Sequence, residues 1–125
     1  MDRLPVAQMN PLSLAFVGDA VYSLWMREAA AWHGGLVGGL HNACVALVNA
    51  AAQAEAARQL MPHLTEQEQG IYRRGRNAQV GTAAKGGSLA DYHAATGLEA
   101  LFGYLYLDGQ EERARALFAL IHPDR

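Results

Sequence analysis

The stretch LSLAFVGDAVYSLWM, residues 12–26, predicts a long apolar helix and is the most informative part of this sequence. Its one charged residue is Asp19, and no other charge occurs between Arg3 and Arg27. Apolar residues three, four or seven positions away share a helical face with Asp19, namely Leu12, Ala15, Phe16, Tyr22 and Met26. A carboxylate removed from water is costly unless it is paired or binds a cation. Asp19 is therefore a candidate functional residue.

A second stretch, AATGLEALFGYLYL over residues 94–107, repeats this pattern around Glu99, its only charged residue. The residues that share its predicted helical face are Tyr92, Thr96, Phe102 and Tyr106. Two isolated acids on the two most apolar helices suggest that Asp19 and Glu99 meet in the fold. Each would then raise the pKa of the other unless a cation or an arginine lay between them. The alternative is that either acid serves as an ion-pair or helix-cap partner.

The composition fits a single all-α domain over residues 1–125. Hydrophobic residues make up 51% of the chain, alanine is abundant, and apolar positions recur at helical spacing. The longest charge-poor stretch contains Pro5, Asn10 and Pro11, which argues against a membrane span or a signal peptide. The single cysteine, Cys44, excludes an internal disulfide and fits a reducing, cytoplasmic location.

Helix start and stop signals predict five helices, over residues 11–32, 40–61, 65–74, 88–107 and 110–121. Asn10 is a suitable N-cap for the first helix, and capping boxes open the third at Thr65 and the fourth at Ser88. Gly75 is expected to end the third helix. The segment GRNAQVGTAAKGGS, residues 75–88, then reads as a mobile functional loop.

The charge distribution is uneven although the formal net charge is only −2, which argues against a generic nucleic-acid binder. No acid occurs between Glu68 and Asp91. This window contains four of the ten basic residues, Arg73, Arg74, Arg76 and Lys85. Two interpretations remain open, a solvated helix end favoured by the helix dipole or an edge that binds phosphates.

Three segments together resemble the catalytic domain of the ribonuclease III family, and more closely its stand-alone Mini-III branch. They are NPLSLAFVGDAVYSLWMRE at residues 10–28, RRGRNA at residues 73–78 and YHAATGLEALFGYLYL at residues 92–107. A weaker match is LHNAC at residues 40–44. The order and spacing agree over nearly the whole chain, so the combination is specific although GDAV alone would be weak.

The resemblance implies that Asp19 and Glu99 are the metal-binding, catalytic acids of a helical fold with about five to seven helices. It further implies Mg²⁺ as the cofactor, or Mn²⁺ in its place, and cleavage of both strands of double-stranded RNA by a homodimer. The implied substrate is precursor large-subunit ribosomal RNA, with a large-subunit ribosomal protein as a helper. The longer ribonuclease III enzymes have further acids where this chain has Leu12, Ala15 and Thr96, so fewer direct ligands are expected here.

The chemistry agrees with these roles. Mg²⁺ held by two carboxylates and several waters can activate water and stabilise phosphoryl charge, so two acids suffice without a nucleophilic side chain. Arg73, Arg74, Arg76 and Lys85 suit the phosphates of a duplex, and Asn77 a groove hydroxyl. The competing functions are a non-catalytic RNA-binding ribosome-assembly factor and a helical dimerisation module. The two isolated acids oppose the former, and the acid-free basic window opposes the latter.

A dimer is expected on physical grounds as well, because two strands need two sites and the chain has one acid pair. Six aromatic residues are more than a small helical domain is expected to cover, so some should lie at a subunit interface: Phe16, Tyr22, Trp25, Phe102, Tyr104 and Tyr106. Gly18 and Gly103 lie on the acid-bearing helices, where a missing side chain admits a close neighbour. We expect the dimer surface near these two glycines.

Overall fold

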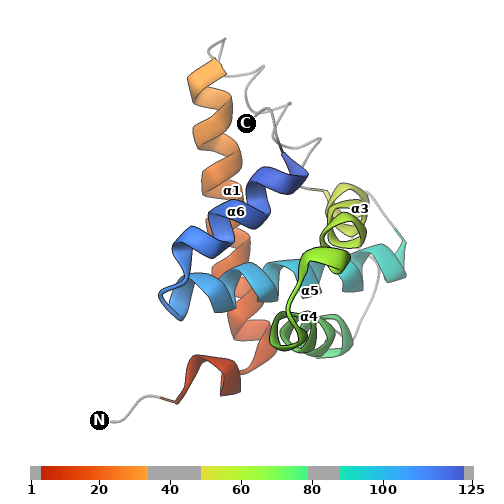
Figure 1. The fold of residues 1–125 in the computed structure, drawn as a ribbon. Coiled ribbons are helices and arrows are strands. Elements are labelled where there is room, and N and C mark those ends of the chain that lie inside the picture. The colour runs from red at the N-terminus through yellow and green to blue at the C-terminus, as the bar shows by residue number, and fades with distance from the viewer. Residues whose placement is uncertain (1–3, 34–48, 79–87, 123–125) are drawn as a thin grey trace.

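The computed structural model describes residues 4–33, 49–78 and 88–122. These residues form α-helices and short 3-10 helices, with no strand among them, which confirms the all-α prediction (Figure 1). The α-helices are α1 (Pro11–His33), α3 (Ala50–Leu60), α4 (Glu66–Ala78), α5 (Leu89–Leu107) and α6 (Glu111–Ile121). The 3-10 helices are η1 (Val6–Gln8) and η2 (Met61–His63). Within the described ranges, no helix combines the length and hydrophobicity that crossing a lipid bilayer requires.

Most helix ends follow the predicted capping signals. The Asn10 side chain accepts a hydrogen bond of 2.8 Å from the Leu12 backbone N–H at the start of α1. Both predicted capping boxes are present, since Thr65 and Glu68 exchange side-chain and backbone hydrogen bonds before α4, and Ser88 and Asp91 do so before α5. Gly109 then adopts a φ of 76° in the turn between α5 and α6, where glycine carries no steric penalty.

Two predicted boundaries were wrong. The helix predicted from residue 40 does not run without interruption, because Asn49 is extended and its side chain accepts from the Ala52 N–H at 2.9 Å, which starts α3 at Ala50. Residues 34–48, including Cys44, lie outside the described residues. Helix α4 also continues through Gly75 to Ala78, so the predicted loop is helical over its first four residues.

The reason that Gly75 does not end α4 is its contact with α5. A Cβ atom at Gly75 would lie 2.6 Å from the Ala100 Cβ and 3.0 Å from the Gly97 Cα. The missing side chain therefore allows close helix packing, and the stability of that contact outweighs the low helix propensity of glycine.

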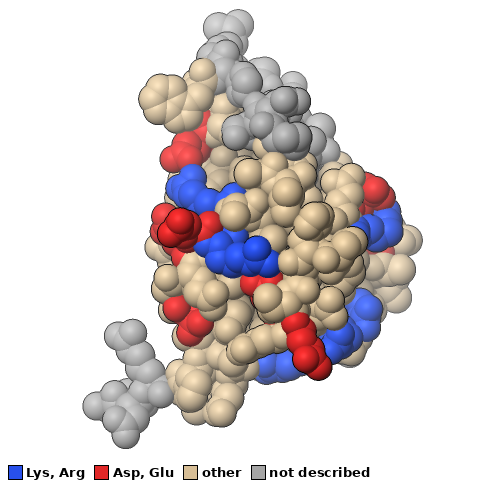
Figure 2. Space-filling model, viewed as in Figure 1, with Lys and Arg blue, Asp and Glu red and all other residues tan. Residues whose placement is uncertain are grey.

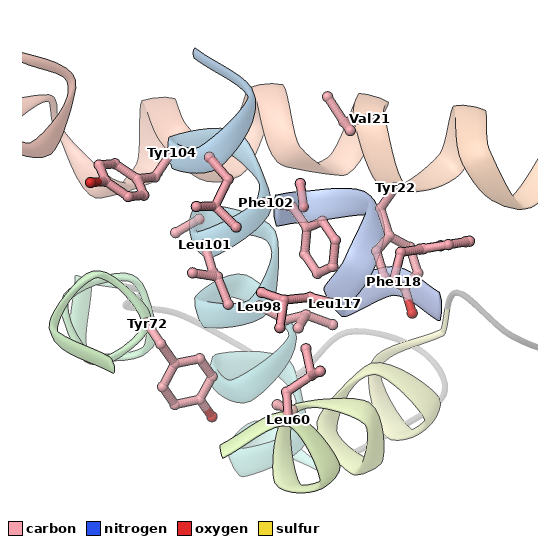
Figure 3. Packing of buried hydrophobic residues seen from close by; sticks show 14 of the residues in the cluster. Val21, Tyr22, Leu60, Tyr72, Leu98, Leu101, Phe102, Tyr104, Leu117 and Phe118 are labelled. Atoms are coloured by element: carbon pink, nitrogen blue, oxygen red, sulfur yellow. The ribbon is translucent and has the colours of Figure 1, made fainter. Parts of the chain in front are cut away.

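Helix α5 is the central element, because it packs against α1, α3, α4 and α6 (Figure 1). The Tyr22 ring meets Phe102 edge to face with centroids 5.4 Å apart, and meets Phe118 at 5.5 Å (Figure 3). Tyr22, Trp25, Phe102 and Tyr104 are all buried. This single chain thus covers most of the aromatic residues that the sequence singled out.

Helices α1 and α5 cross with their backbones in direct contact. A Cβ atom at Gly18 would lie 1.7 Å from the Glu99 carbonyl oxygen, and one at Gly103 would lie 1.8 Å from the Leu14 carbonyl oxygen. The expected close neighbour is therefore confirmed for both glycines. Each glycine is covered by the other helix of the same chain, and the dimer surface expected near them stays a prediction.

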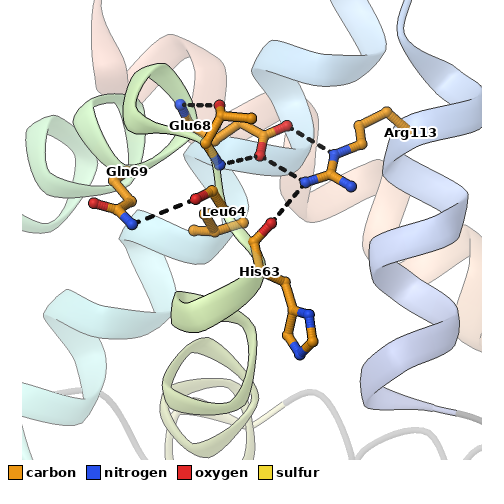
Figure 4. Close-up of polar contacts among 6 residues, drawn as sticks. His63, Leu64, Glu68, Gln69 and Arg113 are labelled. Atoms are coloured by element: carbon orange, nitrogen blue, oxygen red, sulfur yellow. Dashed lines mark hydrogen bonds and ion pairs between the residues drawn. The ribbon is translucent and has the colours of Figure 1, made fainter.

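An ion pair with a buried carboxylate joins α4 to α6. The Glu68 carboxylate accepts hydrogen bonds from the Nε and a terminal nitrogen of Arg113, each 3.0 Å long (Figure 4). That terminal nitrogen also donates to the His63 carbonyl oxygen at 2.8 Å. The hydrogen bonds and charge of Arg113 lower the pKa of Glu68 although burial opposes the shift. Glu68 is thus a buried acid with a full structural explanation.

Candidate active site

Asp19 and Glu99 meet at the crossing of α1 and α5. Asp19 follows Gly18, and Gly18 packs directly on the Glu99 backbone. Asp19 is exposed and Glu99 is half-buried, so the pair lies at the protein surface with one member reaching inward. The expectation that the two acids meet is fulfilled, whereas the expected burial of Asp19 was wrong. Its neighbours Leu12 and Phe16 lie on the exposed side of α1, so the apolar stripe around it is only partly a core face.

The electrostatics of this pair differ from those of Glu68. Burial, together with the negative charge of Asp19 and a hydrogen bond with its side chain, raises the pKa of Glu99 to about 8. A hydrogen bond from the Gln53 side chain acts in the opposite direction. Among the described residues, no lysine, arginine or histidine forms an ion pair with Glu99. The local charge is therefore uncompensated within this part of the chain.

These residues fit a hard divalent cation. Carboxylate oxygens are the ligands that Mg²⁺ prefers, and a cation between two acids would offset the burial and the repulsion that raise the pKa of Glu99. The described residues bring no third histidine, cysteine, aspartate or glutamate into such a site. A bound Mg²⁺ would then keep several water ligands, which is its usual behaviour in proteins.

The positions where related enzymes are expected to have further acids cannot supply ligands here. Leu12 and Ala15 are apolar, and Thr96 is buried. The Thr96 hydroxyl donates a hydrogen bond of 3.0 Å to the Tyr92 carbonyl oxygen in the preceding turn of α5. The structure therefore agrees with a site that has only two acidic ligands.

The predicted basic edge lies on the last turns of α4. Arg73, Arg74, Arg76 and Asn77 are all exposed. The Arg76 Nε donates to the Asn77 side-chain oxygen at 3.3 Å, and its guanidinium carbon lies 5.8 Å from the centre of the Tyr72 ring. On the face shown in Figure 2, basic and acidic side chains lie next to one another in small mixed groups. Lys85 lies outside the described residues.

Arg74 has a structural contact that the sequence did not reveal. Its two terminal nitrogens donate to the backbone carbonyl oxygens of Ala7 at 2.5 Å and Met9 at 3.0 Å. Two of its donors thus hold the η1 segment against α4, and the remaining N–H groups face other partners or solvent. Arg73 and Arg76 have no such bond to the amino-terminal segment among the contacts of the described residues.

The basic edge and the acid pair lie on different sides of α5. Gly75 of α4 packs against Gly97, whereas Gly18 of α1 packs against Glu99. Positions two residues apart are separated by about 200° around a helix. Within one chain, the arginines of α4 are therefore not placed directly over the acid site.

One polar neighbour of the acid pair was missed by the sequence reasoning. Gln53 on α3 is 3% exposed, and its amide nitrogen donates to the Glu99 Oε2 at 3.4 Å. A signal was present, because Gln53 shares the inward side of an alanine-rich segment with Ala50, Ala54 and Ala57. An amide on such a face needs a partner, but the sequence alone did not show which one.

Comparison with known proteins identifies clear relatives. A family model described as Ribonuclease III domain matches residues 12–110. The chain is 51% identical over 106 residues to the Mini-ribonuclease 3 of Symbiobacterium thermophilum, which covers 84% of this chain and 82% of that protein. It is 46% identical over 116 residues to the Mini-ribonuclease 3 of Thermoanaerobacter sp. strain X514, with 92% and 82% covered. A crystal structure of a Fusobacterium nucleatum protein matches with a TM-score of 0.86 at 28% identity, over 93% of each chain.

Proposed function

Because this chain belongs to the ribonuclease III family, in its Mini-ribonuclease 3 branch, and is an endoribonuclease, we propose that it cleaves double-stranded RNA with Mg²⁺ held by Asp19 and Glu99. The observation that supports this proposal most is the convergence of two acids, with no basic partner among the described residues, at a backbone contact between α1 and α5. Mn²⁺ is expected to act in place of Mg²⁺, because it also takes oxygen ligands.

The residues of the site have distinct tasks. Mg²⁺, when bound, supplies an activated water and stabilises charge on the phosphoryl and leaving oxygens. Asp19 and Glu99 act as its ligands rather than as nucleophiles, and Glu99 releases its proton when the ion binds. The contact of Gly18 with the Glu99 backbone holds the two acid-bearing helices close together. The exposure of Asp19 leaves room for an RNA backbone to approach.

The proposed duplex contacts come from the basic edge. Double-stranded RNA is recognised mainly through its shape, phosphates and 2′-hydroxyls. Arg73 and Arg76 are assigned to phosphates, and Asn77 to a groove hydroxyl, because all three are exposed on α4. Arg74 retains donors for a phosphate beside its bonds to the amino-terminal segment. Lys85 remains a predicted contact of the same edge.

The outer face of α1 supports the proposal of a homodimer. Leu12, Phe16 and Leu24 are 41%, 82% and 61% exposed, and they lie four or eight residues apart on one side of the helix. Exposed apolar groups of this kind are typical of an interface. Since Asp19 lies on the same side, pairing two copies through Phe16 would bring the two acid sites near one two-fold axis. Tyr106, at 45% exposure, remains a further candidate for the interface.

Sedimentation equilibrium at micromolar concentration tests the dimer directly. Mixing wild-type with Asp19→Asn subunits tests whether each subunit cuts one strand. A heterodimer has one competent site and should nick a single strand of the duplex. A monomer that still cuts both strands at one locus would contradict the two-site arrangement.

The proposed natural substrate is the precursor of large-subunit (23S) ribosomal RNA in the cytoplasm, with a large-subunit ribosomal protein assisting. This assignment is supported by membership in the Mini-ribonuclease 3 branch. Purified protein should cleave long duplex RNA in Mg²⁺, lose activity in EDTA and leave single-stranded RNA intact. Cleavage that persists in EDTA would refute the metal-dependent mechanism. Binding to the duplex without any cleavage would instead favour a non-catalytic assembly factor.

A further inference from the structure

Gln53 is the buried polar side chain that the proposed mechanism leaves without a role. Three polar or charged side chains are buried among the described residues, namely Gln53, Glu68 and Thr96. Arg113 accounts for Glu68, and a bond within α5 accounts for Thr96. The bond of Gln53, 3.4 Å long, goes to the Glu99 carboxylate on a different helix. Burying an amide is unfavourable unless it is hydrogen-bonded, so this contact is the reason that an amide is tolerated there.

The surroundings of Gln53 make it a fixed donor. The Asn49 cap defines the start of α3, and the Gln53 backbone N–H donates to the Asn49 carbonyl oxygen at 3.0 Å. Ala50, Ala54 and Ala57 are buried beside it, and their small side chains let α3 pack closely on α5 (Figure 1). The amide therefore projects from a capped, well-packed helix rather than from a loop.

We propose that Gln53 is a positioning residue that holds the Glu99 carboxylate in place for the divalent cation. This inference rests on the proposed function. A glutamate side chain has several rotatable bonds, and a fixed donor reduces the entropy that metal binding must otherwise remove. A carboxylate oxygen has more than one acceptor site, so the bond to Gln53 leaves sites free for an ion.

The chemistry of the donor supports this role. Arg113 neutralises Glu68, whereas the amide of Gln53 is uncharged and orients Glu99 without cancelling its negative charge. A neutral donor therefore leaves the acid pair attractive to a cation. Hydrogen-bond partners behind metal ligands typically contribute a factor of about 10 to 100 in metal affinity or activity.

Metal affinity measured without RNA tests the inference. Mn²⁺ binding is followed by electron paramagnetic resonance for wild type, Gln53→Met and Gln53→Glu, and the Mg²⁺ concentration for half-maximal cleavage is measured in parallel. Gln53→Met should weaken Mn²⁺ binding about 10- to 100-fold and raise the Mg²⁺ requirement equally. Gln53→Glu should bind Mn²⁺ more tightly than wild type, because it adds a carboxylate to the pair. Opposite directions for substitutions of similar size are not expected from a merely structural amide.

Gln67→Met is the matched control. The Gln67 amide also links two helices, donating to the Tyr104 hydroxyl at 3.0 Å, but it does not contact the acid pair. The Mn²⁺ affinity of Gln67→Met should equal that of wild type. If Gln53→Met fails to fold, Gln53→Asn replaces it, because the shorter amide loses reach to Glu99 and should also weaken Mn²⁺ binding.

The outcomes separate this inference from the proposed function. Wild-type Mn²⁺ affinity in Gln53→Met, or in Gln53→Asn where that variant replaces it, would overturn the positioning role, even with cleavage intact. A wild-type protein that binds no Mn²⁺ and cleaves no duplex would overturn the proposed function itself. A loss of Mn²⁺ binding as large in Gln67→Met as in Gln53→Met would also overturn the inference, since the effect would not be specific to the acid pair.

Discussion

Glu68 and Glu99 are two inward-reaching acids that the protein treats in opposite ways. Glu68 joins α4 to α6, and Arg113 supplies its positive partner through two hydrogen bonds. Glu99 lies where α1, α3 and α5 meet, and its partners are the acid Asp19 and the neutral amide of Gln53. The pKa of Glu68 is lowered, whereas that of Glu99 is raised to about 8. A buried charge with a charged partner indicates a structural role, whereas an acid pair with no positive partner among the described residues is the arrangement that a bound cation would complete.

The largest expected effect is the loss of activity on neutralising the acid pair. Asp19→Asn and Glu99→Gln should each reduce cleavage of duplex RNA below detection, because each removes a metal ligand. Glu99→Gln should leave the metal-free fold intact or more stable by up to roughly 3 kcal/mol at pH 7, since it removes a carboxyl whose pKa is about 8 when folded. A cleavage assay and denaturant unfolding in EDTA measure the two quantities.

Glu68→Gln is the matched control for that comparison. It should reduce the free energy of unfolding by roughly 2 kcal/mol, a discounted value because the Arg113 side chain is 36% exposed. Its cleavage activity per folded molecule should remain close to wild type. If Glu68→Gln abolished cleavage and Glu99→Gln did not, the assignment of roles to the two glutamates would be reversed.

The second expected effect concerns the helix crossing that places Asp19 beside Glu99. In Gly18→Ala the new Cβ would lie 1.7 Å from a backbone oxygen of α5, so the two helices must separate. We expect a loss of roughly 3 kcal/mol or more in unfolding free energy and a fall in cleavage to the fraction of molecules that still folds. Thermal unfolding and an assay at low temperature measure both.

Gly70→Ala provides the control for this substitution. Gly70 lies within α4, and a Cβ atom there would meet nothing within 4 Å. The higher helix propensity of alanine should stabilise the protein by roughly 0.5–1 kcal/mol. A similar destabilisation in both variants would show that glycine loss in general, rather than the crossing of α1 and α5, is responsible.

The third expected effect is that Glu68 and Glu99 make the free energy of unfolding depend on pH in opposite directions. The folded pKa of Glu99 lies above its ordinary value of 4.5, so the folded state binds more protons between about pH 4.5 and 8. Its contribution to the stability of metal-free protein is therefore lost as pH rises through that window. Glu68 has a lowered pKa, and its contribution is lost as pH falls through the folded value. Thermal unfolding in EDTA from pH 3 to 9 should show both trends.

The affinity for Mg²⁺ should depend on pH through the protonation of Glu99. Because the ion displaces a proton from Glu99, apparent Mg²⁺ affinity should fall toward tenfold per pH unit below about pH 8. Calorimetry in two buffers of different ionisation enthalpy would detect the released proton. An affinity that does not change between pH 6 and 8, with no proton release, would show that Glu99 is already ionised in the metal-free protein.

Helical spacing explains why the meeting of the two acids could be predicted from the sequence. Asp19 and Glu99 are single charges on apolar helices, and Gly18 and Gly103 admit close backbone contact, so local patterns pointed to the crossing. The exposure of Asp19 could not be predicted, because α1 is apolar on nearly all sides and its periodicity does not distinguish the core face from an exposed apolar face.

The remaining differences arise from contacts between segments distant in the chain. Gly75 reads as a helix end locally, but its packing on Gly97 keeps it inside α4. Arg74 belongs to a basic cluster in the sequence, yet it bonds to Ala7 and Met9 more than 60 positions away. Contacts between residues far apart in the chain leave no local sequence pattern. The helix end predicted at Gly75 and the role predicted for Arg74 could therefore be corrected only with the three-dimensional structure.

The smallest expected effect distinguishes the arginines of α4 that bind RNA from the one that also stabilises the fold. Arg73→Ala and Arg76→Ala should each weaken binding to all duplexes similarly and reduce the salt slope of log affinity by about 1, since each removes one phosphate contact. Arg74→Ala should change this slope less. It should instead lower the unfolding free energy by roughly 1 kcal/mol, because the carbonyl oxygens of Ala7 and Met9 lose their donors.

Arg58→Ala separates a local phosphate contact from a general loss of positive charge. Arg58 is exposed on α3 and pairs with Glu55 at 2.6 Å, so it has the same formal charge as Arg76 but lies on a different helix. If Arg58→Ala lowers the salt slope as much as Arg76→Ala, the duplex responds to the overall field and α4 is not a specific edge. If Arg74→Ala lowers the slope as much as Arg73→Ala and Arg76→Ala do while the stability of the fold is unchanged, then the bonds of Arg74 to the amino-terminal segment open in the complex and all three arginines contact the RNA.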